Sequence, residues 1–329
     1  MSSKKASISE FSIIEKYFSN IGQSKGVSLG VGDDCAILEI PSDKQLVTSV
    51  DTLVEAIHFP SNSSPSDIAQ RALRVNLSDI AAMGAEPHWF TLALTHQTGN
   101  EEWIYRFSKA LERDAKKFGC TLVGGDLTAG PLSITIQVLG TVDRGKAIKR
   151  SGVKEGDYIY VTGSLGEAAA ATFIFEKPLN LSNPLPKSSI DRLYNKFYRP
   201  EPRIKEGILL QNIASSAIDI SDGLIADLGH ILSSKSYGAN IEFKRIPYAN
   251  FLTDVADHDL IQKWILSGGD DYELCFTVPK KSVALLESMI ASQKIQACYI
   301  GQVSIDPGIR CYDDQGKLLN IIKSGYQHF

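Results

Sequence analysis

Apolar residues recur at helix or strand spacing along most of the chain, and predicted helices and strands alternate. In the first half, the spacing of apolar positions predicts helices over residues 8–18, 68–83 and 103–118. Shorter apolar runs predict strands over residues 46–50, 89–95, 121–123 and 132–142. This alternation is typical of a unit in which helices cover a sheet.

The apolar pattern lapses into charged residues and glycines between residues 143 and 157, so we place a domain boundary there, giving units 1–148 and 149–329. The second unit is predicted to have strands over residues 158–162, 216–220, 240–243, 272–278 and 297–303. Its helices are predicted after Gly166 and over residues 203–213, 223–234, 259–266 and 280–291. Residues 176–190, which are interrupted by prolines and serines, are predicted to be a surface loop. The predicted fold class is α/β, with two α+β-type two-layer units.

Composition narrows the function classes. Lys and Arg total 34 against 38 Asp and Glu, and the net charge of −4 argues against a nucleic-acid or membrane partner. Five cysteines without a C-x-x-C pair suggest neither a disulfide framework nor a zinc site. No apolar run approaches the ~20 residues of a membrane helix. We therefore expect a cytoplasmic protein.

Aspartates recur beside glycine or serine in short segments, a pattern that indicates hard-metal chemistry. Carboxylates brought together repel one another unless a cation lies between them, and Mg²⁺ prefers oxygen ligands. We expect these side chains to converge on folding into one magnesium site, whose natural partner is a phosphate ester. The segments are Gly32-Asp33-Asp34, Ser49-Val50-Asp51, Asn76-Leu77-Ser78-Asp79, Gly124-Gly125-Asp126, Asp219-Ile220-Ser221-Asp222-Gly223 and Gly268-Gly269-Asp270-Asp271.

Several of these segments also have purely structural interpretations. Asp51, at the end of a predicted strand, fits either a site or a helix N-cap. Gly124-Gly125-Asp126 fits either an anion and cation site or a hairpin turn. Ser221 or Asp222 fits an N-cap, a phosphate site at a helix end, or both. Asp79 lies on a predicted apolar helix, where an unpaired carboxylate would be costly, so a partner is implied.

Taken in order, these motifs resemble the thiamine-monophosphate kinase family. The resemblance continues through Lys149-Arg150-Ser151-Gly152, Tyr160-Val161-Thr162-Gly163 and Gly325-Tyr326, so it covers nearly the whole chain. It implies the fold of the aminoimidazole-ribonucleotide synthetase superfamily, with an N-terminal synthetase-like domain that dimerises through its sheet and a C-terminal α/β domain that completes the active site. The implied partners are ATP, several Mg²⁺ ions, thiamine monophosphate and a second copy of the chain.

The resemblance also implies roles for individual residues. The implied metal ligands are Asp34, Ser49, Val50 (through its carbonyl), Asp51, Asp79, Asp126, Asp219 and Asp222. The implied ATP contacts are Gly125, Asp126, Arg150 and Ser221. His58 and Asp270 match positions that contact thiamine phosphate, and Asp270 stands where some relatives have Glu. Lys323 stands where relatives often place an aromatic residue against the thiamine ring.

The implied reaction is ATP-dependent phosphorylation of thiamine monophosphate to thiamine diphosphate, the final step of thiamine diphosphate biosynthesis, by direct in-line transfer. No general base is expected, because a phosphate monoester with a second pKa of about 6 is largely dianionic at neutral pH. Catalysis is assigned to metal-binding Asp51 and Asp126. The alternatives are another ATP-dependent synthetase of the superfamily and a non-catalytic nucleotide-binding protein. The sequence contains no P-loop, protein-kinase loop set or G-x-G-x-x-G motif.

Overall fold

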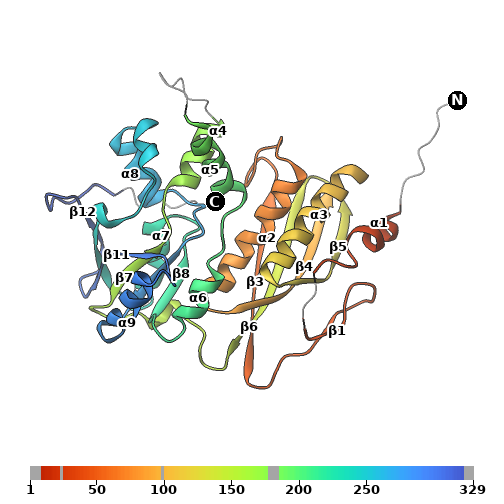
Figure 1. Ribbon diagram of the computed structural model, residues 1–329, viewed down its shortest axis with the longest axis horizontal. Coiled ribbons are helices and arrows are strands. Elements are labelled where there is room, and N and C mark those ends of the chain that lie inside the picture. The colour runs from red at the N-terminus through yellow and green to blue at the C-terminus, as the bar shows by residue number, and fades with distance from the viewer. Residues whose placement is uncertain (1–8, 23–24, 98–99, 177–184, 322–329) are drawn as a thin grey trace. The chain divides into compact units, whose positions relative to one another are not determined.

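The computed structural model describes residues 9–22, 25–97, 100–176 and 185–321, and the chain forms two compact units (Figure 1). Unit 1 holds Met1–Ile80 and Glu86–Arg144, and unit 2 holds Ala81–Ala85 and Gly145–Phe329. The main change from one unit to the other thus falls between Arg144 and Gly145, within the segment where the apolar pattern lapses.

Unit 1 is a two-layer arrangement in which helices cover one face of a four-stranded sheet (Figure 1). The strand order is β3-β6-β4-β5, so β3 and β5 are the two edges. Its helices are α1 (Glu10–Tyr17), α2 (Pro65–Ala82) and α3 (Glu101–Phe118). Its strands are β1 (Val27–Leu29), β2 (Ile37–Leu38), β3 (Lys44–Val54), β4 (Glu86–His96), β5 (Thr121–Ala129) and β6 (Ser133–Asp143).

Helix α3 forms where the sequence predicted it because local signals and burial agree. The Asn100 side chain caps its N-terminus by accepting from the amides of Glu102 and Trp103. Gly119 ends it in the left-handed conformation at φ 70°, where glycine is favoured. Its buried side chains fall on one face and include Phe107 and Leu111. The helix therefore presents one apolar stripe to the sheet.

Strands β3 and β5 of unit 1 extend well beyond the ends that the sequence predicted. The prediction that Asp51 ends a strand, or caps a helix, is wrong because β3 runs from Lys44 to Val54. The alternative of a hairpin turn at Gly124-Gly125-Asp126 is also wrong, since these residues continue β5 in parallel pairing with β4. A side chain at Gly125 would meet the carbonyl oxygen of Leu92 at 1.9 Å, and its φ is 155°. Glycine is therefore what allows the strand to continue.

Unit 2 is built on a six-stranded mixed sheet of order β12-β9-β11-β7-β10-β8. Its strands are β7 (Tyr158–Thr162), β8 (Ser216–Asp219), β9 (Gly238–Glu242), β10 (Leu274–Val278), β11 (Ala297–Ser304) and β12 (Gly308–Tyr312). Its α-helices are α4 (Glu167–Glu176), α5 (Lys187–Tyr198), α6 (Ile204–Leu210), α7 (Leu224–Ser233), α8 (His258–Ser267) and α9 (Lys280–Ala291). Short 3₁₀ helices are η1 (Arg150–Gly152), η2 (Phe243–Arg245) and η3 (Asn250–Asp254).

The α/β class is confirmed, and the unit 2 sheet carries apolar clusters on both faces. Along β7, Ile159 and Val161 join the cluster that also contains residues of α4, α5, α7 and α8. Tyr160 points to the opposite face, as alternation along a strand requires, and joins a cluster with residues of α6 and α9. Unit 2 thus has one helical layer more than the two-layer expectation.

The prediction of a surface loop over residues 176–190 is wrong at its C-terminal end. Helix α5 begins at Lys187, directly after Pro186, and buries Leu193, Phe197 and Tyr198 on one side. The prolines that suggested a loop lie before this helix. Proline is well tolerated at a helix start, because its missing amide hydrogen has no partner within the helix there.

Candidate functional site

Ser49, Asp51 and Asp79 come together at the β3 edge of unit 1. Ser49 and Asp51 are two residues apart on β3, so their side chains leave the same face. Asp79 of α2 reaches this face, where its Oδ2 accepts a hydrogen bond of 2.6 Å from Ser49 Oγ. The partner that the sequence implied for Asp79 is therefore present.

Asn76, which the sequence reasoning did not single out, ties the same part of α2 to β3. Its Oδ1 accepts from the Asp51 amide at 3.0 Å, and its Nδ2 donates to the Ala72 carbonyl at 2.9 Å. Asn76 lies three residues before Asp79 in the same motif, and residues three apart share one helix face. That spacing could have identified it as a residue that positions Asp51.

The donor set at the β3 edge fits a hard cation. Carboxylate and hydroxyl oxygens are the ligands that Mg²⁺ prefers, and Ser49, Asp51 and Asp79 supply only these. The Val50 side chain lies on the opposite face and is 57% exposed, so only its backbone carbonyl could serve as a ligand. In the part of the chain that the structure describes, no three His, Cys, Asp or Glu side chains group as a metal site.

Asp34, Gly125 and Asp126 line one cavity of about 430 Å³ in unit 1. Asp34 is exposed and follows Gly32, whose φ of 123° is favourable only for glycine. Its amide donates to Asp33 Oδ1 at 2.8 Å. Asp126 Oδ2 accepts from Thr128 Oγ1 at 2.6 Å. The fold therefore gathers a predicted metal ligand and two predicted ATP contacts that are about 90 positions apart in sequence.

The two groups of unit 1 lie at opposite edges of the sheet. Asp51 pairs with Ile136, Ile136 with Leu92, and Leu92 with Gly125, so Asp51 and Gly125 occupy one row. Three strand spacings separate them by about 14 Å. Oxygens on one Mg²⁺ are only about 4 Å apart at most. A single copy of unit 1 therefore does not form the one magnesium site that the sequence led us to expect.

His58, a predicted substrate residue, is held in a turn after β3. Its Nδ1 accepts from the Val54 amide at 3.0 Å, and its carbonyl accepts from Arg71 Nε at 3.1 Å. With Nδ1 as an acceptor, the proton of the neutral ring sits on Nε2. His58 can therefore act as a hydrogen-bond donor at Nε2.

In unit 2, Asp219, Ser221 and Asp222 lie between β8 and α7. The prediction that Ser221 or Asp222 caps α7 with its own side chain is wrong, because the N-cap is Gly223. The buried Asp227 takes that role, and its Oδ2 accepts the amides of residues 221, 222 and 223 at 3.0 to 3.1 Å. Burial raises the pKa of Asp227 to about 7, although the hydrogen bonds from these three amides act to lower it. These three amides are thus engaged by Asp227.

The segment from Gly268 to Glu273 is fastened to the Ser221 segment by backbone bonds. The Asp270 amide donates to the Ser221 carbonyl at 2.9 Å, and the Tyr272 amide donates to the Ile220 carbonyl at 2.8 Å. Asp270 and Tyr272 have φ values of 70° and 50°, which are uncommon for residues with side chains. Such strain concentrates at functional sites. The backbone hydrogen bond from Asp270 to Ser221 holds these two residues next to each other.

Glu273, which the sequence reasoning did not single out, is the centre of a buried ion network. It is 2% exposed and accepts from Lys196 Nζ at 2.8 Å, Arg203 Nη2 at 2.7 Å and Thr162 Oγ1 at 2.7 Å. Burial alone would raise its pKa, but Lys196 and Arg203 hold the pKa below its usual value. The network joins α5 and the start of α6 to the strand that follows Asp270.

Asp271 is fully buried, and burial raises its pKa to about 8. The Asp271 carboxyl therefore stays protonated in the folded state up to about pH 8. In the unfolded state the same carboxyl loses its proton near the ordinary pKa of Asp, at about pH 4. Stability from this group is complete at low pH and falls as pH rises between these values.

We predict that Asp271→Asn gains stability relative to the parent as pH rises from 5 to 9, measured as Tm. A constant Tm difference would contradict the assignment.

The remaining predicted residues are Arg150 and Lys323. Arg150 is exposed on η1, and Lys323 lies outside the described residues.

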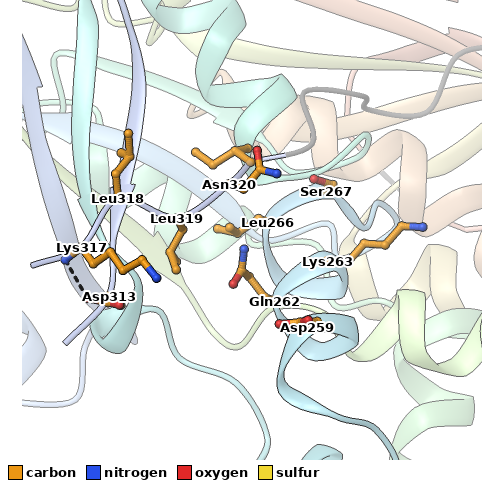
Figure 2. Close-up of a pocket in the computed structure, with 11 residues that line it drawn as sticks. Asp259, Gln262, Lys263, Leu266, Ser267, Asp313, Lys317, Leu318, Leu319 and Asn320 are labelled. Atoms are coloured by element: carbon orange, nitrogen blue, oxygen red, sulfur yellow. Dashed lines mark hydrogen bonds between the residues drawn. The ribbon is translucent and has the colours of Figure 1, made fainter. Parts of the chain in front are cut away.

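A second cavity, of about 420 Å³, lies in unit 2 between α8 and the segment after β12 (Figure 2). Its walls carry Lys263 and Lys317 as well as Asp259, but it contains no predicted site residue. None of the described helices is long and apolar enough to cross a membrane.

Comparison with known proteins agrees with this architecture. Residues 32–142 match the family model for the N-terminal domain of AIR synthase related proteins, and residues 154–314 match the model for the C-terminal domain. The chain is 43% identical to the thiamine-monophosphate kinase of Escherichia coli K12, over 97% of this chain and 98% of that protein.

Two solved structures are also similar. The thiamine-monophosphate kinase of Stenotrophomonas maltophilia K279a is 37% identical with a TM-score of 0.82, over 90% of this chain and 93% of that one. A structure described as AaThiL complexed with AMPPCP and TMP is 27% identical with a TM-score of 0.75, over 92% and 93% of the two chains. Through this likeness over nearly its whole length, the chain belongs to the thiamine-monophosphate kinase family of AIR synthase related proteins.

Proposed function

We propose that this protein transfers the γ-phosphoryl group of ATP to thiamine monophosphate, producing thiamine diphosphate. The observation that carries the proposal is 43% identity over almost all of both chains to a thiamine-monophosphate kinase. It is supported by the similar structure described with an ATP analogue and TMP. The reaction completes the synthesis of thiamine diphosphate.

The chain's own residues have to bring two anions together. Ser49, Asp51 and Asp79 at one edge of the unit 1 sheet, and Asp34 and Asp126 at the other, are proposed to bind Mg²⁺. When bound, Mg²⁺ neutralises phosphate charge and stabilises the charge that develops in transfer. Asp219 and Asp222 are proposed as further ligands and Val50 as a carbonyl ligand. Gly125, Arg150 and Ser221 are proposed to contact ATP, and His58 and Asp270 thiamine monophosphate.

No residue is assigned as a general base. The attacking phosphate monoester is already largely dianionic at neutral pH, since its second pKa is about 6. His58 is therefore proposed to hold substrate through its Nε2 hydrogen rather than to remove a proton. Catalysis by Asp51 and Asp126 is then electrostatic, through the cations they hold, and depends on positioning of the two phosphates.

We propose that the protein works as a homodimer joined through the unit 1 sheet. The face of β3 that is not covered by α2 leaves Leu46 44% and Val50 57% exposed. Both β3 and β5 are sheet edges, which leave backbone groups able to pair with another chain. If edge β3 of one copy lies beside edge β5 of the other, the two separated carboxylate groups become neighbours.

A cytoplasmic location is proposed because the reaction consumes ATP.

The proposed reaction is tested by incubating the purified protein with ATP, Mg²⁺ and thiamine monophosphate. Thiamine diphosphate and ADP are expected in equal amounts by chromatography. Another synthetase of the superfamily would leave thiamine monophosphate unchanged, and a non-catalytic nucleotide-binding protein would also leave ATP unchanged. Either result would refute the proposed function.

Arg150→Ala is predicted to raise the KM for ATP about tenfold with a small effect on kcat. Arg150 is an exposed cation on η1, so its loss removes a phosphate contact worth about 1–2 kcal/mol without disturbing the core. Steady-state kinetics with varied ATP measures the change. Lys154→Ala, at another exposed cation of unit 2, is the matched control. An unchanged KM for ATP in Arg150→Ala would remove this residue from the site.

A further inference from the structure

The backbone from Gly268 to Asp270 is packed so closely against its neighbours that it has little room to shift. A Cβ on Gly269 would lie 2.3 Å from the Ser221 carbonyl oxygen, and one on Gly268 would lie 2.3 Å from the Trp264 carbonyl oxygen. The Asp270 amide also donates to the Ser221 carbonyl. The direction of the Asp270 carboxylate is therefore decided by its own side-chain torsions and by the groups that bond to it.

The four residues from Asp270 to Glu273 alternate between two surroundings. Asp271 and Glu273 are each 2% exposed, and Asp271 Oδ2 accepts from the Gly166 amide at 2.8 Å. Asp270 and Tyr272 are only half-buried. The buried pair fastens the segment to the interior of unit 2, so Asp270 and Tyr272 are the members of the segment that a ligand can reach.

Tyr272 bonds to Asp270 and holds an unfavourable backbone conformation. Its Oη donates to Asp270 Oδ1 at 3.1 Å. Its φ of 50° suits glycine or a short polar residue such as aspartate, but it is an outlier for a bulky side chain. Strain of this kind persists where the surroundings impose it, and it clusters at functional sites. A tyrosine in this conformation calls for a role, and its bond to a proposed substrate residue supplies one.

The direction of the Asp270 carboxylate matters for the proposed substrate. Thiamine monophosphate carries a positive thiazolium ring and a negative phosphate. A carboxylate near the ring attracts the substrate, whereas a carboxylate near the phosphate repels it. A hydroxyl that holds Oδ1 in place restricts the carboxylate before the substrate arrives, which lowers the ordering cost of binding.

We propose that Tyr272 is a positioning residue for thiamine monophosphate, whose hydroxyl holds the Asp270 carboxylate toward the thiazolium ring and away from the phosphate. The inference rests on the proposed function, which assigns Asp270 to this substrate. Tyr272 acts through Asp270 and takes no part in the phosphoryl transfer itself.

Tyr272→Phe tests the proposal, because it removes the hydroxyl and keeps the ring. The loss of one hydrogen bond is expected to raise the KM for thiamine monophosphate about fivefold. The kcat and the KM for ATP should not change, since the bond acts on binding of one substrate. Calorimetry with AMPPCP and Mg²⁺ present should show the same fivefold weakening of thiamine monophosphate binding. An unchanged affinity would overturn the proposal.

Asp270→Asn tests the direction of the carboxylate. Asn keeps the shape of Asp and is tolerated at the φ of 70°. Loss of a charge that faces the thiazolium ring should raise the KM for thiamine monophosphate about tenfold. A lower KM would show that the carboxylate faces the phosphate, contrary to the proposal.

The double variant shows whether Tyr272 acts through Asp270. Adding Tyr272→Phe to Asp270→Asn should raise the KM for thiamine monophosphate by less than about twofold more, because the hydroxyl then has no charge to orient. An undiminished fivefold rise in this background would mean that Tyr272 acts independently of Asp270, and the proposal would be wrong.

Tyr160→Phe is the matched control. Tyr160 Oη also donates to a carboxylate of unit 2, at 2.7 Å from Glu287 Oε1, but neither residue belongs to the proposed site. Its loss should leave both KM values unchanged. If Tyr160→Phe raised the KM for thiamine monophosphate as much as Tyr272→Phe does, the effect would be a general one and the proposal would fail.

Failure of this inference can be told apart from failure of the proposed function. If the parent binds thiamine monophosphate but makes no thiamine diphosphate, the proposed function fails while calorimetry still decides the role of Tyr272. If the parent makes thiamine diphosphate and Tyr272→Phe binds the substrate as the parent does, only this inference fails. A parent that binds no thiamine monophosphate would overturn both.

Discussion

Replacing Asp51 by Asn is expected to lower kcat about a thousandfold while the fold stays intact. The substitution exchanges a carboxylate for a neutral amide of the same shape on the face of β3 that carries Ser49, so the proposed cation site loses a full negative charge. The Asp51 side chain is exposed, and its backbone amide keeps the bond to Asn76. The measurement is kcat for thiamine diphosphate formation, together with Tm to confirm folding.

Asp143→Asn is the matched control for this substitution. Asp143 is an exposed aspartate at the end of β6 whose ion pair with Lys44 lies at the surface, so its loss should change stability by less than about 1 kcal/mol and leave kcat unchanged. Asp126→Asn should lower kcat as strongly as Asp51→Asn. A folded Asp51→Asn variant with normal kcat would remove Asp51 from the catalytic site.

Glu273→Ala is expected to lower the free energy of unfolding of unit 2 by about 3–5 kcal/mol, because removing one partner of a buried ion pair leaves the other charge uncompensated. Lys196 and Arg203 would keep their charges with side chains only 19% and 14% exposed. For a unit of this size the loss corresponds to a fall in Tm of about 10 °C. Differential scanning calorimetry measures the change in Tm.

Glu112→Ala provides the comparison for that result. Glu112 also pairs with two cations, Lys109 and Lys116, but both side chains are more than half exposed. Its loss should therefore cost no more than about 1 kcal/mol. Equal, small changes in Tm for Glu112→Ala and Glu273→Ala would show that the buried network contributes little to stability.

The elements with strong local signals could be predicted from the sequence. The spacing of apolar residues in α2 and α3 predicted both helices, and the Gly119 end of α3 was visible in the sequence. The pairing of Asp79 was also predictable, because a carboxylate among Leu77 and Ile80 requires a polar partner. Local chemistry thus indicated which residue types the candidate site would contain.

Other features depend on contacts between segments far apart in sequence. Local sequence left Gly124 and Gly125 open to either a binding site or a hairpin turn, and pairing with β4 is what keeps them extended. Nothing local indicates that β6 and β4 separate Asp51 from Asp126. The network around Glu273 joins side chains 70 to 111 positions away. Burial and strand order, rather than local propensity, decide these features.

The most direct test of the account follows the γ-phosphorus of ATP. The protein is incubated with γ-³²P-labelled ATP, Mg²⁺ and thiamine monophosphate, and the products are separated. Direct transfer predicts that the label appears in thiamine diphosphate, with one labelled molecule for each ADP formed. Label recovered as inorganic phosphate, with thiamine monophosphate unchanged, would contradict the account.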